Sequence, residues 1–302
     1  MEEYKKFGTT DLFMLLAVLF WAINFPCIKI ALREFSPLGF NGIRLFLSAL
    51  VLIIVFSISK EGFSLSRSDL WKLIILGIIG NTFFQLFFIH GINWTTASNT
   101  AIIMAMTPVF IALLSVLLKH EKIHKAAWIG ILVSFIGFYF VITKTGAFHF
   151  SWQNMKGDLM ILSGNLFWAV YTVFSRPLLK RISPLKLVSI SLAFGALFYL
   201  PFSVRSIIQL DWNGLSFMAW AGLVYSALFA ICISYIFWYS SVKRVGNIKT
   251  AIYGNITPVL TIIFAYIVLS ERITPLQAGG TLIILLGVYL ARSRYRLFEA
   301  SG

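Results

Sequence analysis

The sequence predicts an all-α integral membrane protein, and three observations support this prediction. Hydrophobic residues make up 59% of the 302 residues and charged residues only 12%, whereas a soluble globular chain is about 25% charged. The mean hydropathy of +0.87 leaves too little polar surface for a water-facing protein and excludes a disordered chain. The apolar residues also form runs of about 20, which is the length that spans a bilayer core.

Ten such runs are expected to be transmembrane helices. They are continuously apolar rather than alternating in polarity, which argues against an outer-membrane β-barrel. The gaps between most of them are too short for a separate soluble catalytic domain. The ten runs cover residues 11–31, 37–59, 70–92, 97–118, 126–143, 157–176, 185–204, 215–238, 248–269 and 275–292.

Local signals support these runs in order along the chain. The first follows Lys5 and Lys6, as in a signal peptide, but it is long enough to span and no convincing cleavage site follows, so we predict that it is retained. The second and seventh begin at a Ser-Pro-Leu motif. The third, sixth and eighth carry polar or aromatic residues within the apolar sequence. The fourth and ninth contain Thr-Pro. The fifth and tenth carry paired glycines that favour close helix packing: Gly130, Gly137, Gly280 and Gly287.

The net charge of +14 has a pattern that indicates orientation rather than nucleic-acid binding. Lys and Arg lie mainly in the short gaps between runs, as in cytoplasmic loops. With a cytoplasmic N-terminus, 18 of them lie inside, 6 outside and Arg44 within a span, which accounts for all 25. We therefore expect an inner-membrane protein with both termini cytoplasmic. Cys27 and Cys232 lie in apolar runs and predict neither a disulfide framework nor a metal site.

The two halves of the chain resemble each other, which predicts a first five-helix repeat at 1–150 and a second at 151–302. Because each repeat has an odd number of spans, the second enters the membrane from the opposite side. This is the inverted-repeat architecture of secondary transporters. The matches are Phe-Trp-Ala at 20–22 and 167–169, Ser-Pro-Leu at 36–38 and 183–185, Thr-Pro-Val at 107–109 and 257–259, and Glu121 with Glu271.

The same motifs resemble a known family. They are Trp-Ala-Ile-Asn-Phe-Pro-Cys-Ile-Lys at 21–29, Ser36-Pro37 followed by Arg44, and Thr107-Pro108 followed by Glu121 and the paired glycines, with their second copies. In this order they resemble the EamA-type branch of the drug/metabolite transporter superfamily. The resemblance implies export of amino acids and other small metabolites across the inner membrane. The second copy has Arg176 at the position of Lys29, so the halves are not equivalent.

We therefore expect a secondary transporter that works by alternating access and is not an enzyme. A membrane receptor or scaffold would not need an inverted repeat, and an intramembrane enzyme would need acids deep in the spans. All seven acids in or near the spans, Asp158 among them, are read as lying at span ends or in loops. No ATP-binding loop, metal cluster or cofactor motif is present. The expected partners are a small-molecule substrate and membrane lipid, with no nucleic acid, and the expected assembly is a monomer or weak homodimer.

The candidate substrate-binding residues are aromatic, amide and basic side chains inside spans. A polar group costs several kcal/mol in lipid unless it is satisfied, so these side chains should face the bundle or a cavity. Hydrogen bonding between helices is the structural alternative. Interface anchoring is a further alternative for the tryptophans, although Trp21 and Trp168 lie about ten residues deep. The candidates are Trp21, Asn24, Arg44, Gln85, Trp168, Tyr171, Tyr235, Trp238 and Asn255.

Proton coupling and hinges have few candidates. His90 is the only group inside a span that titrates near physiological pH, and a neutral, hydrogen-bonded histidine is the alternative. Without a buried carboxylate we expect transport driven by substrate gradients and membrane potential. Pro108 and Pro258 lie inside runs, where each should remove an intrahelical hydrogen bond and bend its helix, as a candidate hinge or as a static kink.

Arg44 and Lys29 are expected in the outer part of the bundle, without an acidic neighbour within a helical turn. Arg44 lies seven residues into its span, about 10 Å deep. Either cation could snorkel to the interface, with Glu34 as a structural partner. Arg also suits bidentate binding of a carboxylate. The functional hypothesis is therefore that Arg44 holds a substrate carboxylate.

Overall fold

The computed structural model describes residues 8–59, 61–62, 64–118, 125–143 and 152–292, and every regular element in these ranges is helical. The two chain termini, which are expected to be cytoplasmic, and Glu121 lie outside the described residues. The first half of the described chain, residues 8–143, contains α1 (Thr9–Ala31), α2 (Pro37–Ile58), α3 (Arg67–Gly77), the π-helical η1 (Ile78–Phe83), α4 (Phe84–Trp94), α5 (Ala97–Met104), α6 (Thr107–Leu117) and α7 (Lys125–Thr143).

The second half, residues 152–292, follows a similar sequence of elements. It begins with the long α8, which occupies the position of α1, and again contains a π-helical segment between two α-helices. The elements are α8 (Trp152–Leu179), α9 (Pro184–Ile208), α10 (Phe217–Tyr225), the π-helical η2 (Ser226–Ile233), α11 (Ser234–Val245), α12 (Asn247–Gly254), α13 (Thr257–Leu269) and α14 (Pro275–Arg292).

Seven helical stretches among the described residues are long and apolar enough to cross a membrane. Three shorter apolar helices, at Trp128–Val141, Thr257–Leu269 and Pro275–Leu290, accompany them. These three fall within the runs expected at 126–143, 248–269 and 275–292. The seven stretches are Thr9–Ala31, Pro37–Ile58, Arg67–Trp94, Ala97–Leu114, Trp152–Leu179, Pro184–Ile208 and Phe217–Val245.

The helix starts follow from local sequence. Ser36 Oγ accepts a hydrogen bond from Gly39 N at 3.3 Å, and Ser183 Oγ accepts one from Lys186 N at 3.0 Å. Each serine is followed by a proline at the start of its helix. A serine N-cap satisfies an otherwise free backbone N–H, and proline suits the first helical turn because it has no N–H to satisfy. The repeated Ser-Pro-Leu motif therefore starts both α2 and α9.

Pro108 and Pro258 differ from their expected role as bends inside continuous helices. Each is the second residue of a new helix, α6 or α13, after an interruption of two residues. Proline fits there because the first turn of a helix has no intrahelical N–H bond to lose. Pro26, by contrast, does lie inside α1 and is buried. The Thr-Pro motifs thus divide their runs into α5 with α6 and α12 with α13.

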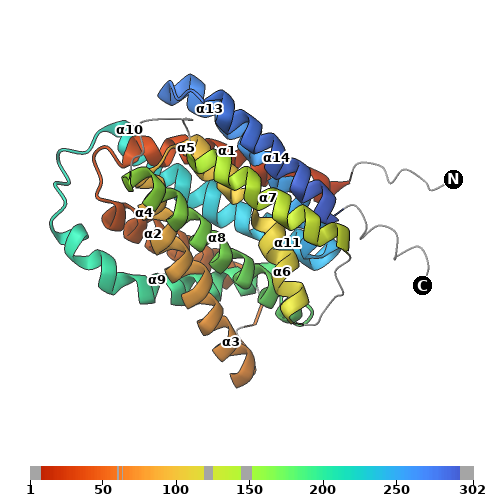
Figure 1. Cartoon of the computed structure of the whole chain (residues 1–302). Helices are drawn as coiled ribbons and strands as arrows, with labels where there is room; N and C mark the ends of the chain where they lie inside the picture. The colour runs from red at the N-terminus through yellow and green to blue at the C-terminus, as the bar shows by residue number, and fades with distance from the viewer. Residues whose placement is uncertain (1–7, 60, 63, 119–124, 144–151, 293–302) are drawn as a thin grey trace, which may run out of the picture.

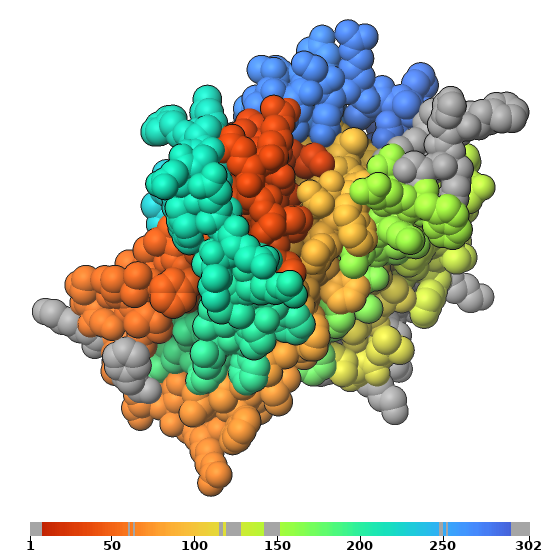
Figure 2. Space-filling model, turned by 90° about the vertical axis from the view of Figure 1, so that its left-hand side faces the viewer, coloured from red at the N-terminus to blue at the C-terminus, as the bar shows by residue number. Residues whose placement is uncertain are grey.

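The two halves interleave in space. α2 packs against α9, α4 against α8 and α7 against α14, while α1 contacts α10, α11 and α13. Figure 1 shows these helices lying roughly along one direction, with the two ends of the described chain on the same side. Figure 2 shows the opposite end, where α1 in red lies between α9–α10 in turquoise and the orange α4–α5 region. Each half therefore covers surfaces of the other.

Glycines permit the closest crossings. A Cβ on Gly77 would lie 2.3 Å from Ser191 O, and one on Gly195 would lie 2.3 Å from Asn81 Cβ. Similarly, a Cβ on Gly137 of α7 would lie 2.7 Å from Gly280 O of α14. Small residues at such positions let two helix backbones approach each other. The predicted close packing of the glycine-bearing helices is present in α7 and α14.

Large apolar side chains cover much of the outer surface. Phe46, Leu132 and Ile267 are 58%, 63% and 69% exposed, respectively. Isolated exposed hydrophobic residues are normal in soluble proteins, but extended apolar surfaces mark interaction with another apolar phase. Together with the apolar helices, these side chains fit a surface that faces lipid.

Candidate functional site

A cavity between the two halves of the chain gathers most of the predicted site residues. Its volume is about 90 Å³, and a single water needs about 10–15 Å³, so it holds on the order of six waters or one small organic molecule. Its walls come from α1, α2, α4–α6 and α8 together with η2 and α11–α13. Eight of the nine predicted substrate-binding residues line it: Trp21, Asn24, Arg44, Gln85, Trp168, Tyr235, Trp238 and Asn255.

Aromatic rings form one side of this cavity. The Trp21 ring centroid lies 5.3 Å from that of Trp238 and 6.3 Å from that of Trp168. Tyr235 lies 5.0 Å from Trp168, between ring centroids. Trp21 Nε1 donates to Ala230 O at 2.9 Å, which fixes its ring against η2. Tilted and edge-to-face rings at these distances attract one another, so the aromatic wall has a defined shape without a ligand.

Arg44 is buried among neutral hydrogen-bond acceptors. Only 1% of the residue is exposed. Its Nη1 donates to Ser226 Oγ at 2.8 Å, and its Nη2 donates to Gln85 Oε1 at 2.5 Å and to Asn41 Oδ1. The guanidinium also lies 5.5 Å from the centre of the Phe40 ring, a favourable cation–π distance. These contacts replace the expected snorkelling of Arg44 toward an interface.

The two π-helical segments precede the residues that connect Arg44 to the aromatic wall. Gln85 follows η1 and Tyr235 follows η2, and Gln85 Nε2 donates to Tyr235 OH at 3.2 Å. Short π-helical segments often occur at functional sites because they shift the faces that side chains occupy. Arg44, Gln85 and Tyr235 thus form a continuous hydrogen-bonded chain across the two halves.

Four polar atoms of cavity-lining residues are buried without a hydrogen-bond partner in the protein. They are Asn24 Oδ1, Arg44 Nε, Trp238 Nε1 and Asn255 Oδ1. A buried polar group that is left unsatisfied costs about 1–3 kcal/mol. Water or a ligand in the cavity can supply the missing partners. The cavity is therefore mainly aromatic, with a few unsatisfied polar groups, as small-molecule sites commonly are.

Comparison with known proteins identifies the chain. The model of the EamA-like transporter family matches residues 8–143 and again residues 155–293. The chain belongs to the EamA-like transporter family. Membership, together with the long apolar helices, makes this protein a multi-pass membrane transporter rather than an enzyme.

Curated relatives of this EamA-like transporter cover nearly its whole length. An uncharacterized transporter of Bacillus subtilis (strain 168), YyaM, is 29% identical over 92% of both chains. An uncharacterized transporter of Archaeoglobus fulgidus is 29% identical over 94% of this chain and 98% of its own. A protein of known crystal structure shares the fold, with 19% identity and a TM-score of 0.69 over 98% of this chain and 99% of that one.

Three predicted residues of the EamA-like transporter do not line the cavity. Tyr171 lies behind Trp168, with its hydroxyl 2.6 Å from Ser191 Oγ, so it supports the aromatic wall from outside. His90 lies half-buried on α4, with its ring centroid 5.8 Å from that of Trp94. Pro258 lies beside the lining residue Thr257, whereas its counterpart Pro108 does line the cavity. The cavity contains no histidine among the described residues.

Lys29 and Glu34 make contacts away from Arg44. Lys29 Nζ donates to Ile92 O at 3.1 Å and to Thr95 O at 2.8 Å, at the carboxyl end of α4, where a cation is favoured by the helix dipole. Glu34 accepts from both N and Oγ of Ser216, each at 2.7 Å. These hydrogen bonds lower the pKa of the Glu34 carboxyl below its ordinary value. Glu34, which was considered as a structural partner for the two cations, bonds to Ser216 instead.

Two acids of the transporter have structural positions that sequence reasoning missed. Asp158 lies seven residues into α8 and is fully buried, where it accepts hydrogen bonds from Thr95 Oγ1 and, at 3.2 Å, from Asn99 Nδ2. Because α8 begins five residues before the predicted run, Asp158 lies within the helix rather than at its first residues. Glu271 accepts from Ala97 N at 2.9 Å and Ser98 N at 3.0 Å at the start of α5, where an anion is favoured.

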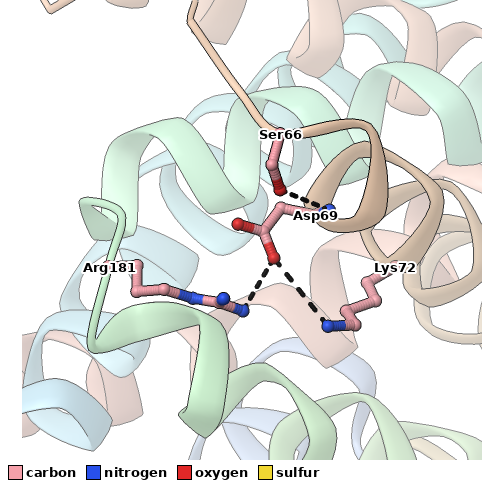
Figure 3. A network of polar contacts seen from close by, with 4 residues as sticks. All are labelled: Ser66, Asp69, Lys72 and Arg181. Atoms are coloured by element: carbon pink, nitrogen blue, oxygen red, sulfur yellow. Dashed lines mark hydrogen bonds and ion pairs between the residues drawn. The ribbon is translucent and has the colours of Figure 1, made fainter.

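Another polar cluster joins the halves away from the cavity. Figure 3 shows Asp69 of α3 between Arg181, whose Nη2 lies 2.7 Å from Asp69 Oδ1, and Lys72, whose Nζ lies 3.9 Å away. Asp69 N also donates to Ser66 Oγ at 3.1 Å at the start of α3. Arg181 is mostly exposed, so this ion pair is partly screened by solvent. This ion pair links α3 to the segment that connects α8 and α9, which indicates a structural role.

Proposed function

We propose that this EamA-like transporter is a secondary transporter that exports small metabolites, amino acids or related compounds, by alternating access, with the cavity as its substrate site. The observation that carries the proposal is the cavity between the halves, with its aromatic walls and unsatisfied polar atoms. Sites at the interface of two structural halves are typical of secondary transporters. The volume of the cavity fits a molecule of few atoms.

The architecture that we propose is ten transmembrane helices in two inverted five-helix repeats, residues 1–150 and 151–302. The corresponding order of elements in the two halves supports it, including η1 and η2 and the interruptions before Thr107 and Thr257. In this architecture α12 and α13 together make the ninth crossing, and α14 makes the tenth. The excess of Lys and Arg in alternate gaps supports cytoplasmic termini in the inner membrane.

For energy coupling we propose facilitated transport without a proton-carrying carboxylate. No Asp or Glu of the described chain lines the cavity, and His90 lies outside it. Substrate gradients would then drive transport. For an anion moving outward, the membrane potential would add about 2.3 kcal/mol per charge at 100 mV. An imposed pH gradient should not by itself drive uphill accumulation in vesicles; accumulation that persists in His90→Ala would contradict both this proposal and a role for His90.

Counterflow in reconstituted liposomes tests the transport function. Vesicles loaded with unlabelled amino acids are diluted into labelled amino acid, and transient uptake is measured against protein-free vesicles. Ala105 lines the cavity and is 3% exposed, so Ala105→Trp should fill the cavity and remove counterflow. Leu132→Trp, at a position 63% exposed on the outer surface, is the matched control and should retain it. Equal counterflow by both variants would remove the cavity from the transport path.

A further inference from the structure

Three buried donors of the cavity remain available to a ligand. Arg44 Nε and Trp238 Nε1 have no acceptor in the protein. The Tyr235 hydroxyl accepts from Gln85 Nε2, so its own hydrogen is left to donate. These side chains are 1%, 2% and 3% exposed, respectively, and all three line the cavity. Buried donors normally have an acceptor, and the oxygens of a ligand in the cavity would supply the acceptors that these donors lack.

The positive charge of Arg44 also favours a negatively charged ligand in the cavity. Arg44 bonds only to the neutral side chains Asn41, Gln85 and Ser226. The ion pairs found among the described residues both involve Asp69, which does not line the cavity. An unneutralised guanidinium is unfavourable away from water. A ligand with one negative charge would neutralise it, whereas a multiply charged anion would leave excess negative charge in an aromatic cavity.

We propose that Arg44, Tyr235 and Trp238 bind the carboxylate of a small organic acid whose apolar body lies against Trp21 and Trp168. This rests on the proposed function, because it names the substrate class of the same cavity. A carboxylate has two oxygens that accept several hydrogen bonds, and a charged hydrogen bond is stronger than a neutral one. The aromatic rings provide apolar contact for the rest of the molecule. A simple carboxylic acid and an α-amino acid both carry this group.

Ligand-dependent thermal unfolding of the purified full chain tests the proposal. The probes are propionate, isovalerate and benzoate, each paired with its uncharged amide of nearly the same shape, and valine as the zwitterion. A ligand that binds the folded state raises the melting temperature by mass action. At least one acid should raise it at concentrations where its amide has no effect. Stabilisation by valine as well would identify amino acids as a source of the carboxylate, and its absence would restrict the site to simple acids.

Donor-removing variants locate the carboxylate. Tyr235→Phe and Trp238→Phe keep a ring and lose one donor, so each should weaken binding of the acid on the order of tenfold. Arg44→Gln should remove the preference for acid over amide, and Arg44→Lys should retain part of it because the charge remains. Arg205→Gln removes an exposed cation and should bind as the unchanged protein does. The two Phe variants keep the test decisive if Arg44→Gln does not fold.

Any one of three results would overturn the proposal. The first is equal stabilisation by acids and their amides, and the second is unchanged acid binding in both Tyr235→Phe and Trp238→Phe. Counterflow of an uncharged solute without binding of any acid would also overturn it, while leaving the transport function intact. Absence of counterflow for every solute, together with normal acid binding, would instead contradict the proposed function and retain the carboxylate site.

Discussion

Arg44 takes its position from Asn41 on its own helix and from Gln85 and Ser226 on two other segments. The sequence indicates that such a residue needs partners, because a guanidinium is unfavourable in a membrane. It does not indicate which partners, since Gln85 lies 41 residues away and Ser226 lies 182 away. Glu34, the acid nearest in sequence, bonds to Ser216 instead. At the scale of one residue, the sequence predicted that Arg44 needs hydrogen-bond partners, but it did not predict which residues they are.

Gln85→Glu should supply the anion that Arg44 lacks. The new carboxylate would occupy the position of Gln85 Oε1, 2.5 Å from Arg44 Nη2, and would neutralise the guanidinium within the protein. We expect a folded protein whose affinity for carboxylate ligands falls by at least tenfold, measured by thermal-shift titration. Gln209→Glu, at an exposed position at the end of α9, is the control. Unchanged acid binding in Gln85→Glu would show that ligands do not depend on the charge of Arg44.

The contact between Glu34 and Ser216 should depend on pH. The hydrogen bonds from Ser216 favour the charged carboxylate and lower its pKa below 4.5, so their contribution is present above that value and is lost as pH falls through the lowered pKa. Wild type should therefore be more stable than Glu34→Gln at pH 7, and the difference should shrink below pH 4.5. Thermal unfolding of both proteins across this range measures it. A difference that grows on acidification would contradict the assignment.

At the scale of helices, the crossing of α9 with α3 and η1 depends on two glycines. A Cβ on Gly195 would lie 2.3 Å from Asn81 Cβ and 2.8 Å from Gly77 O, distances that require the helices to separate. Gly195→Ala should therefore lower the free energy of unfolding by about 1–3 kcal/mol, measured by denaturant titration in detergent.

Gly279→Ala is the matched control for this crossing. Gly279 lies in α14, and a Cβ there would meet no atom within 4 Å. Alanine is the better helix former by about 1 kcal/mol, so this variant should be as stable as wild type or slightly more stable. If the two substitutions destabilise the protein equally, the close packing of helices at Gly195 is not the cause of the destabilisation.

At the scale of the whole molecule, hydropathy and the length of the apolar runs predicted the helical class and placed most helices within a few residues. The paired glycines also indicated that the fifth and tenth runs pack closely. The interruptions at 105–106 and 255–256 were harder to predict, because Thr-Pro is compatible with a kink or a new helix start. Most candidate residues lie around one cavity because deep polar and aromatic residues avoid lipid. Tyr171 is also an aromatic residue deep in a span, but it bonds to Ser191 outside the cavity. Only the tertiary packing decides whether such a residue faces the cavity or another helix.

The cross-half packing predicts that neither half is stable alone. Residues 1–148 and 149–302, expressed as separate chains, should each be degraded or fail to unfold cooperatively. Expressed together, they should co-purify, because α2 can again pack on α9 and α7 on α14. Co-purification and thermal unfolding measure this. A cooperative transition for residues 1–148 by themselves would show that the contacts within the first half are sufficient.

The same interleaving affects how the protein is made. The first half leaves the ribosome before its partner exists, so the faces of α2 and α7 that later contact α9 and α14 enter the membrane uncovered. Asn41, Arg44 and Gln85 are synthesised before Ser226, and Asp69 before Arg181. Lipid cannot satisfy these groups, so the nascent half needs water, lipid headgroups or the insertion machinery as temporary partners. Slow translation after residue 143 would extend that exposure and increase degradation during synthesis.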